Sequence, residues 1–216
     1  RHLWYATRDN GLACVFYSAS EVTAQAGNEG NEVTIEQRTH YPFNETVEFT
    51  VLADEPVKFP VYLRVPGWCR QPKLRVNGQP QAVAAEPGEY VRILTRWRDG
   101  DSIQWEMPTD ISVRRWRNNH DSVSIKRGPL TYSLNIEEKK IRSGGTDKWP
   151  AWEIHPGSTW NYALALDTNN DKFSFQVVER EWPRNDMPWT HNGTPLMIKT
   201  KGRRVSEWTL DQHRLC

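Results

Sequence analysis

Residues 59–65, Phe59-Pro60-Val61-Tyr62-Leu63-Arg64-Val65, decide the fold of this chain. Apolar side chains occupy every second position of this stretch and alternate with a proline, a tyrosine and an arginine. Successive side chains of a β-strand point to opposite faces of a sheet, so the stretch predicts a strand with one buried face. No window of the sequence shows a convincing amphipathic helix of more than about two turns. Further runs with a period of two are found at 47–51, 103–107, 123–125, 130–134 and 173–177.

Turn signals separate these runs at the short spacing that is typical of antiparallel sheets. Asn77-Gly78 follows an extended run and supplies the two positive-φ positions of a type I′ hairpin. Asp99-Gly100 is the same kind of signal with a longer loop, whereas Arg127-Gly128-Pro129 interrupts a strand pattern and indicates a bulge or a corner. Short strands joined in this way predict an all-β protein of antiparallel, jelly-roll-like β-sandwiches with little helix.

The predicted strands are too numerous for one small pair of sheets. We therefore expect two consecutive β-sandwich domains, at residues 10–110 and 111–216, joined between Pro108 and Val113. Regular alternation fails at 137–160, which we interpret as a long loop within the second domain. Long loops in compact domains are often functional.

Charge and hydropathy limit the partners of the chain. Its 28 basic and 27 acidic residues give a net charge of +1, so neither a nucleic acid nor an anionic membrane is an expected partner. No stretch approaches the ~18 apolar residues that are needed to span a bilayer. The N-terminus has neither the apolar run of a signal peptide nor an initiator methionine, and we expect the sequence to begin within a longer protein.

Carboxylates, the groups that glycosidases use in pairs, are not found in a convincing catalytic pattern. The pair Asp99 and Asp101 belongs to a turn, in which aspartate caps its own backbone. The pair Glu137 and Glu138 is followed by two lysines in the irregular segment. The histidines are scattered, and neither a nucleophile elbow nor a phosphate-binding loop is present.

The three cysteines, Cys14, Cys69 and Cys216, lie far apart and lack the spacing of metal ligands. Cys14 lies in an apolar run, where a small buried side chain is the expected role. We therefore expect no catalytic, cofactor-binding or metal-binding residue in this chain.

Aromatic residues provide the candidates for a binding surface. The chain has 11 Trp, 7 Tyr and 6 Phe, although only 37% of its residues are hydrophobic. A tryptophan next to a proline in a long loop usually holds that loop to a sheet, but an exposed ring can instead stack on the apolar face of a sugar. The candidate carbohydrate-binding residues are Trp149, Trp152, Trp160, Trp182 and Trp189.

Several motifs in a fixed order carry a resemblance to a known family. The motifs are Tyr41-Pro42-Phe43, Leu63-Arg64-Val65-Pro66-Gly67-Trp68-Cys69, Val76-Asn77-Gly78, Gly88-Glu89-Tyr90-Val91, Trp97-Arg98-Asp99-Gly100-Asp101 and Glu106-Met107-Pro108. This succession resembles the middle sandwich region of glycoside hydrolase family 127, the β-L-arabinofuranosidases and their relatives. Residues 123–134 resemble the strand that opens the family's C-terminal sandwich.

The resemblance implies a modular enzyme, in which sandwich domains follow a helical (α/α)₆ barrel with a zinc-bound cysteine nucleophile and an acid/base glutamate. None of these catalytic or zinc residues maps onto this sequence, and Cys69, after a Pro-Gly-Trp turn, is not the nucleophile. Residues 1–9 are then expected to be a remnant of the preceding helical catalytic domain, with His2-Leu3-Trp4-Tyr5 as the end of its last barrel helix. Zinc is expected in the catalytic domain, outside this chain.

The implied function is that of the non-catalytic sandwich portion of a bacterial glycoside hydrolase, inactive alone, that braces its own catalytic barrel. Family habit implies a periplasmic or extracellular location and a plant polysaccharide as a further candidate partner. Two alternatives stay open: a carbohydrate-binding module with exposed tryptophans, and a structural or oligomerisation domain unrelated to sugars, in which the same rings are buried.

Overall fold

The structure, a computed structural model, describes residues 3–165, 175–211 and 214–215. All of the regular secondary structure in this part of the chain is β-strand, which confirms the predicted all-β class. No helix among the described residues has the length and hydropathy that crossing a membrane requires. The chain divides into two compact units: unit 1 is Arg1–Asp110 with Arg127–Leu130, and unit 2 is Ile111–Lys126 with Thr131–Cys216.

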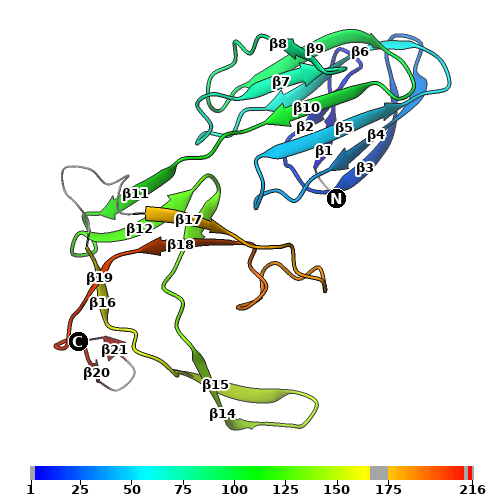
Figure 1. Ribbon diagram of the computed structural model, residues 1–216. Coiled ribbons are helices and arrows are strands. Elements are labelled where there is room, and N and C mark those ends of the chain that lie inside the picture. Colours follow the sequence, from blue (N-terminus) through cyan, green and yellow to red (C-terminus); the bar gives the residue numbers. More distant parts are fainter. Residues whose placement is uncertain (1–2, 166–174, 212–213, 216) are drawn as a thin grey trace. The chain divides into compact units, whose positions relative to one another are not determined.

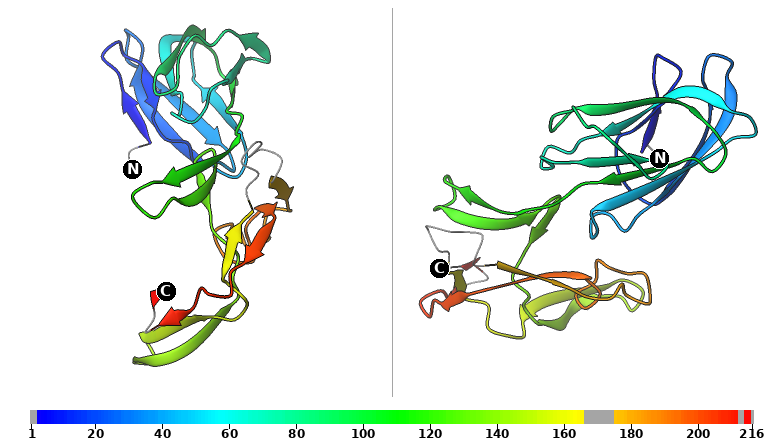
Figure 2. Two further views of the ribbon diagram at one scale, coloured as in Figure 1. Left: turned by 90° about the vertical axis from the view of Figure 1, so that its left-hand side faces the viewer. Right: turned by 45° about the horizontal axis from the view of Figure 1, so that its top comes forward.

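Unit 1 is a sandwich of two sheets (Figures 1 and 2). Within both sheets the neighbouring strands are antiparallel, except that β2 and β6 run parallel. The first sheet has the order β1 (Trp4–Ala6), β2 (Leu12–Cys14), β6 (Val57–Arg64), β9 (Tyr90–Trp97). The second has the order β3 (Ser20–Ala26), β4 (Asn31–Arg38), β5 (Thr46–Leu52), β10 (Ser102–Glu106), β7 (Lys73–Val76), β8 (Gln79–Gln81).

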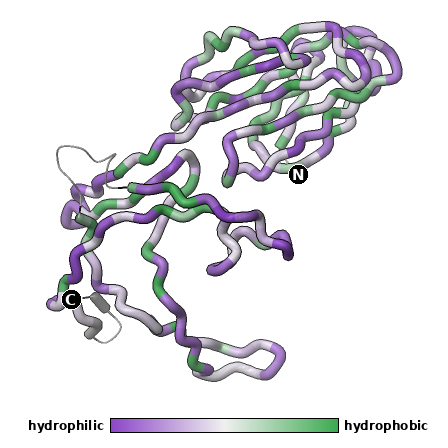
Figure 3. The backbone as a smooth tube through the Cα atoms, in the orientation of Figure 1, coloured by the Kyte–Doolittle hydropathy of each residue, from purple (hydrophilic) through white to green (hydrophobic). Residues whose placement is uncertain are grey.

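The inward faces of these two sheets form one hydrophobic core. Hydrophobic and hydrophilic residues alternate along the strands of unit 1 (Figure 3), as period-two patterning requires. Trp97 and Trp105 are fully buried, and the Nε1 of Trp97 donates a hydrogen bond to the carbonyl oxygen of Phe59 over 3.0 Å. Aromatic bulk therefore fills much of the core, as the composition indicates.

The hairpin turn predicted at Asn77-Gly78 is confirmed. The φ angles of Asn77 and Gly78 are 50° and 75°, and the two residues join β7 to β8. Gly128 and Pro129 form a two-residue turn between β12 and β13, and not the predicted bulge or corner. Gly128 has a φ of +55°, and a Cβ atom there would lie 2.6 Å from Cγ2 of Thr109, so both backbone and space require glycine.

Residues 4–6 form strand β1, and not the helix end that the resemblance implied. The strand pairs antiparallel with β2, with Trp4 opposite Cys14. The ring of Trp4 packs edge-on against Phe49, with 5.8 Å between the ring centroids. The large apolar side chain of Trp4 therefore packs within the sandwich of unit 1. Residues 1–2 lie outside the described residues.

Unit 2 consists of small sheets, of which the largest has three strands. The buried apolar side chains among its described residues are those of Ile125, Pro188, Pro195 and Leu196. The sheets are β11 (Ile111–Trp116) with β12 (Ser122–Arg127) and β13 (Leu130–Tyr132), β14 (Glu138–Gly145) with β15 (Pro150–Pro156), β16 (Tyr162–Leu164) with β19 (Gly202–Arg204), β17 (Phe175–Glu179) with β18 (Leu196–Thr200), and β20 (Leu210–Asp211) with β21 (Arg214–Leu215).

The segment interpreted as an irregular loop, 137–160, is largely a β-hairpin made by β14 and β15, and that interpretation was wrong. These two strands could not be recognised from the sequence, because they are rich in Glu, Lys, Gly and Pro, which are depleted from sheets. Gly145, with a φ of +74°, closes the hairpin, and a Cβ atom there would lie 2.3 Å from the carbonyl oxygen of Trp149.

Candidate functional site

The five candidate tryptophans lie in unit 2, on the β14–β15 hairpin (Trp149 and Trp152), between β15 and β16 (Trp160) and between β17 and β18 (Trp182 and Trp189). Trp149 and Trp189 are the most exposed, at 74% and 71% of their surface, and Trp152 follows at 52%. Trp160 and Trp182 are half-buried, and the Nε1 of Trp182 donates a hydrogen bond to Asp186 over 2.7 Å. Trp182 therefore fits the role of holding its loop, whereas Trp149 and Trp189 present their rings to solvent.

Trp149 and Trp152 both belong to the β14–β15 hairpin. Trp152 lies in β15 opposite Arg142, and Trp149 precedes β15 in the turn. The ammonium group of Lys148 lies 5.7 Å from the centroid of the Trp149 ring, within the range of a cation–π contact. The hairpin thus carries two exposed rings, each with a cationic side chain nearby.

A polar cluster that sequence reasoning missed lies on the outward face of the first sheet of unit 1. The carboxylate of Asp9 accepts hydrogen bonds from Thr7 (2.6 Å), Tyr62 (2.7 Å) and Arg92 (3.2 Å). The bonds from Thr7 and Tyr62, followed by that from Arg92, lower the pKa of Asp9 to about 2. Tyr62 and Arg92 are far from Asp9 in the sequence, and the pairing of β2, β6 and β9 brings them together.

Large apolar side chains lie on the same outward face. Strand register places Tyr5 in one row with Ala13, Tyr62 and Arg92, and puts Tyr90 opposite Arg64. Tyr5 and Tyr90 expose 49% and 41% of their surface. Leu94, in the same strand as Arg92 and two positions further, exposes 45%.

The outward face of the second sheet has a different character. Its β3 and β4 strands carry threonines at Thr23 and Thr34, whose hydroxyl oxygens are 2.8 Å apart, and charged side chains such as Glu36 and Arg38, which form an ion pair of 2.7 Å. Such a face is stable in water without a partner. The two outward faces of the sandwich are therefore unlike: one is aromatic and basic, and the other is polar.

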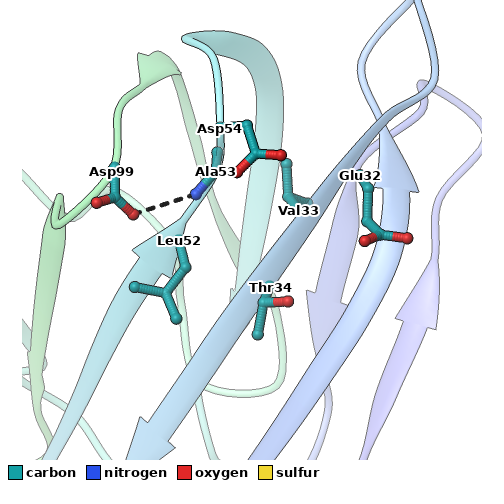
Figure 4. Close-up of a pocket in the computed structure, with 7 residues that line it drawn as sticks. All are labelled: Glu32, Val33, Thr34, Leu52, Ala53, Asp54 and Asp99. Atoms are coloured by element: carbon teal, nitrogen blue, oxygen red, sulfur yellow. Dashed lines mark hydrogen bonds between the residues drawn. The ribbon is translucent and has the colours of Figure 1, made fainter.

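A shallow hollow beside the second sheet gathers three carboxylates, Glu32, Asp54 and Asp99 (Figure 4). They come from β4, from the loop after β5 and from the turn between β9 and β10. Asp99 accepts a hydrogen bond from the backbone N–H of Ala53 over 3.3 Å, so it ties two loops together. Its neighbour Asp101 accepts bonds from the backbone of Arg98 and from the side chain of Asn77. This acidic pair stabilises turns, the role that its position in the sequence favoured.

The other acidic pair lies on the hairpin. Glu138 forms an exposed ion pair with Lys140 over 3.5 Å, and the backbone N–H of Glu137 bonds to the Ser158 hydroxyl. Both contacts belong to the hairpin and its closing residues.

Cys14 and Cys69 are free thiols buried in unit 1. Burial raises the pKa of both, so neither is a ready nucleophile. Cys216 lies outside the described residues. The zinc that the family resemblance implies does not fit the described part of the chain, in which no group of three or more His, Cys, Asp or Glu side chains is arranged to hold a metal ion.

The side chain of Glu45 binds residues from two segments of unit 1, the end of its first segment and residues 127–130. Its carboxylate accepts hydrogen bonds from the backbone N–H of Thr109 (3.0 Å), from the Thr109 hydroxyl and from Arg127 (2.8 Å). The Arg127 side chain is 12% exposed and that of Glu45 is 30% exposed, so this ion pair is largely shielded from water. The cluster is a structural anchor for residues 127–130.

Comparison with known proteins gives a consistent result. Residues 11–109 match the model of a family described as β-L-arabinofuranosidase, GH127 middle domain. A non-reducing end β-L-arabinofuranosidase of Bifidobacterium longum subsp. longum is 30% identical over 173 residues, which are 74% of this chain and 23% of that protein. The chain thus spans about a quarter of the length of this curated relative.

Solved structures of the same family share the fold. A GH127 β-L-arabinofuranosidase from Geobacillus stearothermophilus T6 is 28% identical, with a TM-score of 0.53 over 60% of this chain and 21% of its own. A second GH127 β-arabinofuranosidase, at 16% identity, has a TM-score of 0.52 over 76% of this chain and 30% of its own, and shows a likeness of fold alone.

Proposed function

With residues 11–109 identified as the middle domain of a glycoside hydrolase family 127 protein, we propose that this chain is a non-catalytic β-sandwich portion of a β-L-arabinofuranosidase-like enzyme and braces its catalytic domain. The observation that carries the proposal is the outward face of the first sheet in unit 1. This face exposes Tyr5, Tyr90 and Leu94, while the groups that could perform chemistry nearby are already bonded or buried. Exposed apolar patches rimmed by polar groups are typical of protein contacts.

The first test concerns activity. The purified chain is expected to release no arabinose from aryl β-L-arabinofuranosides, whether or not zinc is added, because its two described thiols are buried and its tight acidic pairs stabilise turns and a hairpin. The measurement is release of the aryl group, with a complete family 127 enzyme as the positive control. Zinc-dependent turnover by the chain would contradict the proposal.

The second test concerns the bracing contact. Leu94→Asp, in the complete enzyme of which we propose this chain to be a part, is expected to lower the melting temperature, because a charge would be buried in the contact. Gln104→Asp is the matched control, since Gln104 is exposed on the outward face of the second sheet. The isolated chain is expected to tolerate both changes equally. Equal effects of the two changes in the complete enzyme would show that this face braces nothing.

A second candidate function, carbohydrate binding, is favoured by the exposure of Trp149 and Trp189. Rings exposed by 74% and 71% are available to stack on the C–H face of a sugar. Affinity electrophoresis in gels that contain arabinan, arabinogalactan or xylan measures this binding. Retardation that is lost in Trp149→Ala or Trp189→Ala, but kept in a variant of half-buried Trp160, would support this function. Unchanged mobility in all three gels would discard it.

A further inference from the structure

The net charge of the chain is distributed unevenly between its two units. Unit 2 has 16 basic and 12 acidic residues, whereas unit 1 has 12 basic and 15 acidic residues. Within unit 2, strands β11 and β12 and the turn between them (Figure 1) carry Arg114, Arg115, Arg117 and Lys126 against the single carboxylate of Asp121. The three arginines are all exposed. This segment is therefore a basic surface on a chain that is close to neutral, and it attracts anions.

Side-chain contacts order one face of these two strands. The Cζ atom of the Arg114 guanidinium lies 3.7 Å from the centroid of the Trp116 ring, which is a cation–π contact. The Nε1 of Trp116 donates a hydrogen bond to the hydroxyl of Ser124 over 3.1 Å. This bond puts Trp116 and Ser124 on the same face, and the alternation of side chains along β11 and β12 adds Arg114 and Lys126 to it. We call these four residues the basic face.

The stacked guanidinium of Arg114 is suited to bind a carboxylate. Its N–H groups form a planar fork that matches the two oxygens of a carboxylate, which the ammonium group of a lysine does not. Stacking on Trp116 holds the arginine side chain before a ligand arrives, so less conformational entropy is lost on binding. The hydroxyl of Ser124 accepts its bond from Trp116 and keeps its own proton to donate. Together these groups favour an acid that also carries hydroxyl groups.

We propose that the basic face binds the uronate residues of an acidic polysaccharide, with a sugar carboxylate on the guanidinium of Arg114. Lys126, on the neighbouring strand, supplies a second positive charge. The choice of a glycan as the anion rests on the proposed function. Charge density also favours a glycan over a nucleic acid, because a uronate chain carries at most one charge per sugar, whereas duplex DNA carries one charge per about 1.7 Å of its axis. A chain with a net charge of +1 has no basic surface broad enough for the denser polymer.

The role of Trp116 in this site differs from that of an exposed ring such as Trp149. The guanidinium of Arg114 covers one face of the Trp116 ring, so Trp116 positions the arginine and does not serve as the platform for a sugar. A neutral arabinan, which has no carboxylate, is therefore not a ligand of the basic face. Binding of a neutral glycan at Trp149 and binding of a uronate at Arg114 are separate and can be measured separately.

Affinity electrophoresis of the 216-residue chain tests the ligand class. One gel contains polygalacturonate, and a second contains the same polymer after methyl esterification, which removes the charge and keeps the sugar. Retardation is expected in the first gel, is expected to fall as salt is added, and is expected to be absent from the second gel. Equal mobility in the two gels would overturn the proposal. Stronger retardation by duplex DNA in a third gel would also overturn it, because the face would then bind any polyanion.

Substitutions of Arg114 test the site. Arg114→Gln is expected to weaken binding to polygalacturonate by roughly tenfold, and Arg114→Lys, which keeps the charge and loses the planar fork, is expected to weaken it as well. Arg203→Gln is the matched control, because it makes the same change at an exposed arginine of β19 in the same unit. Equal weakening by Arg203→Gln, or wild-type binding by Arg114→Lys, would refute the site.

Failure of this proposal is distinguishable from failure of the proposed function. Leu94→Asp in the complete enzyme reports on the brace, and release of an aryl group reports on activity. Binding of polygalacturonate by the isolated chain depends on neither, so a chain that braces nothing can still bind through Arg114. A chain that braces its catalytic domain but migrates equally in the two polygalacturonate gels would refute the uronate site alone.

Discussion

Removing Arg127 is expected to destabilise unit 1 by about 2 kcal/mol. Glu45 and Arg127 are held 2.8 Å apart with little exposure of the arginine, and breaking such a pair leaves a carboxylate partly shielded from water. A fully buried pair would cost about 3–5 kcal/mol. Glu45 keeps its two bonds from Thr109 and is 30% exposed, so we expect the smaller value.

The assay is urea unfolding of Arg127→Ala, followed by near-ultraviolet circular dichroism of the buried Trp97 and Trp105 in unit 1. A loss of about 2 kcal/mol would lower the midpoint by roughly 1 M urea, since unfolding of a domain this small has a slope of about 1–3 kcal/mol per molar. The control is Arg38→Ala, because Arg38 is 76% exposed in its ion pair with Glu36 and such pairs contribute about 0–1 kcal/mol.

A double-mutant cycle with Glu45→Gln isolates the ion pair from the packing of the arginine stem. If Arg127→Ala unfolds at the same urea concentration as Arg38→Ala, the anchor contributes nothing and our account of residues 127–130 is wrong.

Three other predictions follow from the structure. The pKa of Asp9 falls from 3.8 to about 2 on folding, so its carboxylate stabilises the folded state above pH 4 and loses this contribution as the pH falls toward 2. The difference in unfolding free energy between wild type and Asp9→Asn should therefore shrink between pH 4 and pH 2. A pKa near 4 for the Asp9 carboxyl group, measured by NMR in the folded protein, would contradict this prediction. Cys14 and Cys69 should react with a thiol reagent only after denaturant is added, since burial raises the pKa of both; reaction at the rate of a free thiol in the native chain would show that they are accessible. Limited proteolysis should cut unit 2 before unit 1, because unit 2 has few buried side chains. Mass spectrometry should find a protease-resistant fragment near residues 3–110. First cuts within this fragment would count against the prediction.

Strands that alternate cleanly could be predicted from the sequence, and those that do not alternate could not. Phe59, Val61 and Leu63 all face the core of unit 1, as their spacing indicated. β14 was missed because its residues, Glu-Lys-Lys-Ile-Arg-Ser-Gly-Gly, have one aliphatic side chain and no buried face. A period-two signal arises only where one face of a strand is buried, so a ribbon exposed on both faces leaves no such signal.

A second limit on prediction from the sequence concerns side-chain contacts between residues that are far apart in the chain. The turn role of Asp99 and Asp101 could be inferred locally, because aspartate beside glycine bonds to nearby backbone. The cluster of Asp9, Tyr62 and Arg92 could not, because it depends on which strands become neighbours. One of these neighbours is the parallel pair β2 and β6, and no hairpin signal specifies a parallel pair.

Exposed apolar side chains are unevenly distributed between the two units. Ten of the fourteen large hydrophobic residues that are exposed in the described chain belong to unit 2, although unit 1 contains nearly all of the buried ones. Exposed hydrophobic side chains near Ile154 or Trp189 gain free energy only when another surface covers them, at about 25 cal/mol per Å². Unit 1 obtains its stability from its own core. The buried apolar side chains of unit 2 among the described residues are Ile125, Leu196 and two prolines, so we expect unit 2 to gain stability when another surface covers its exposed side chains.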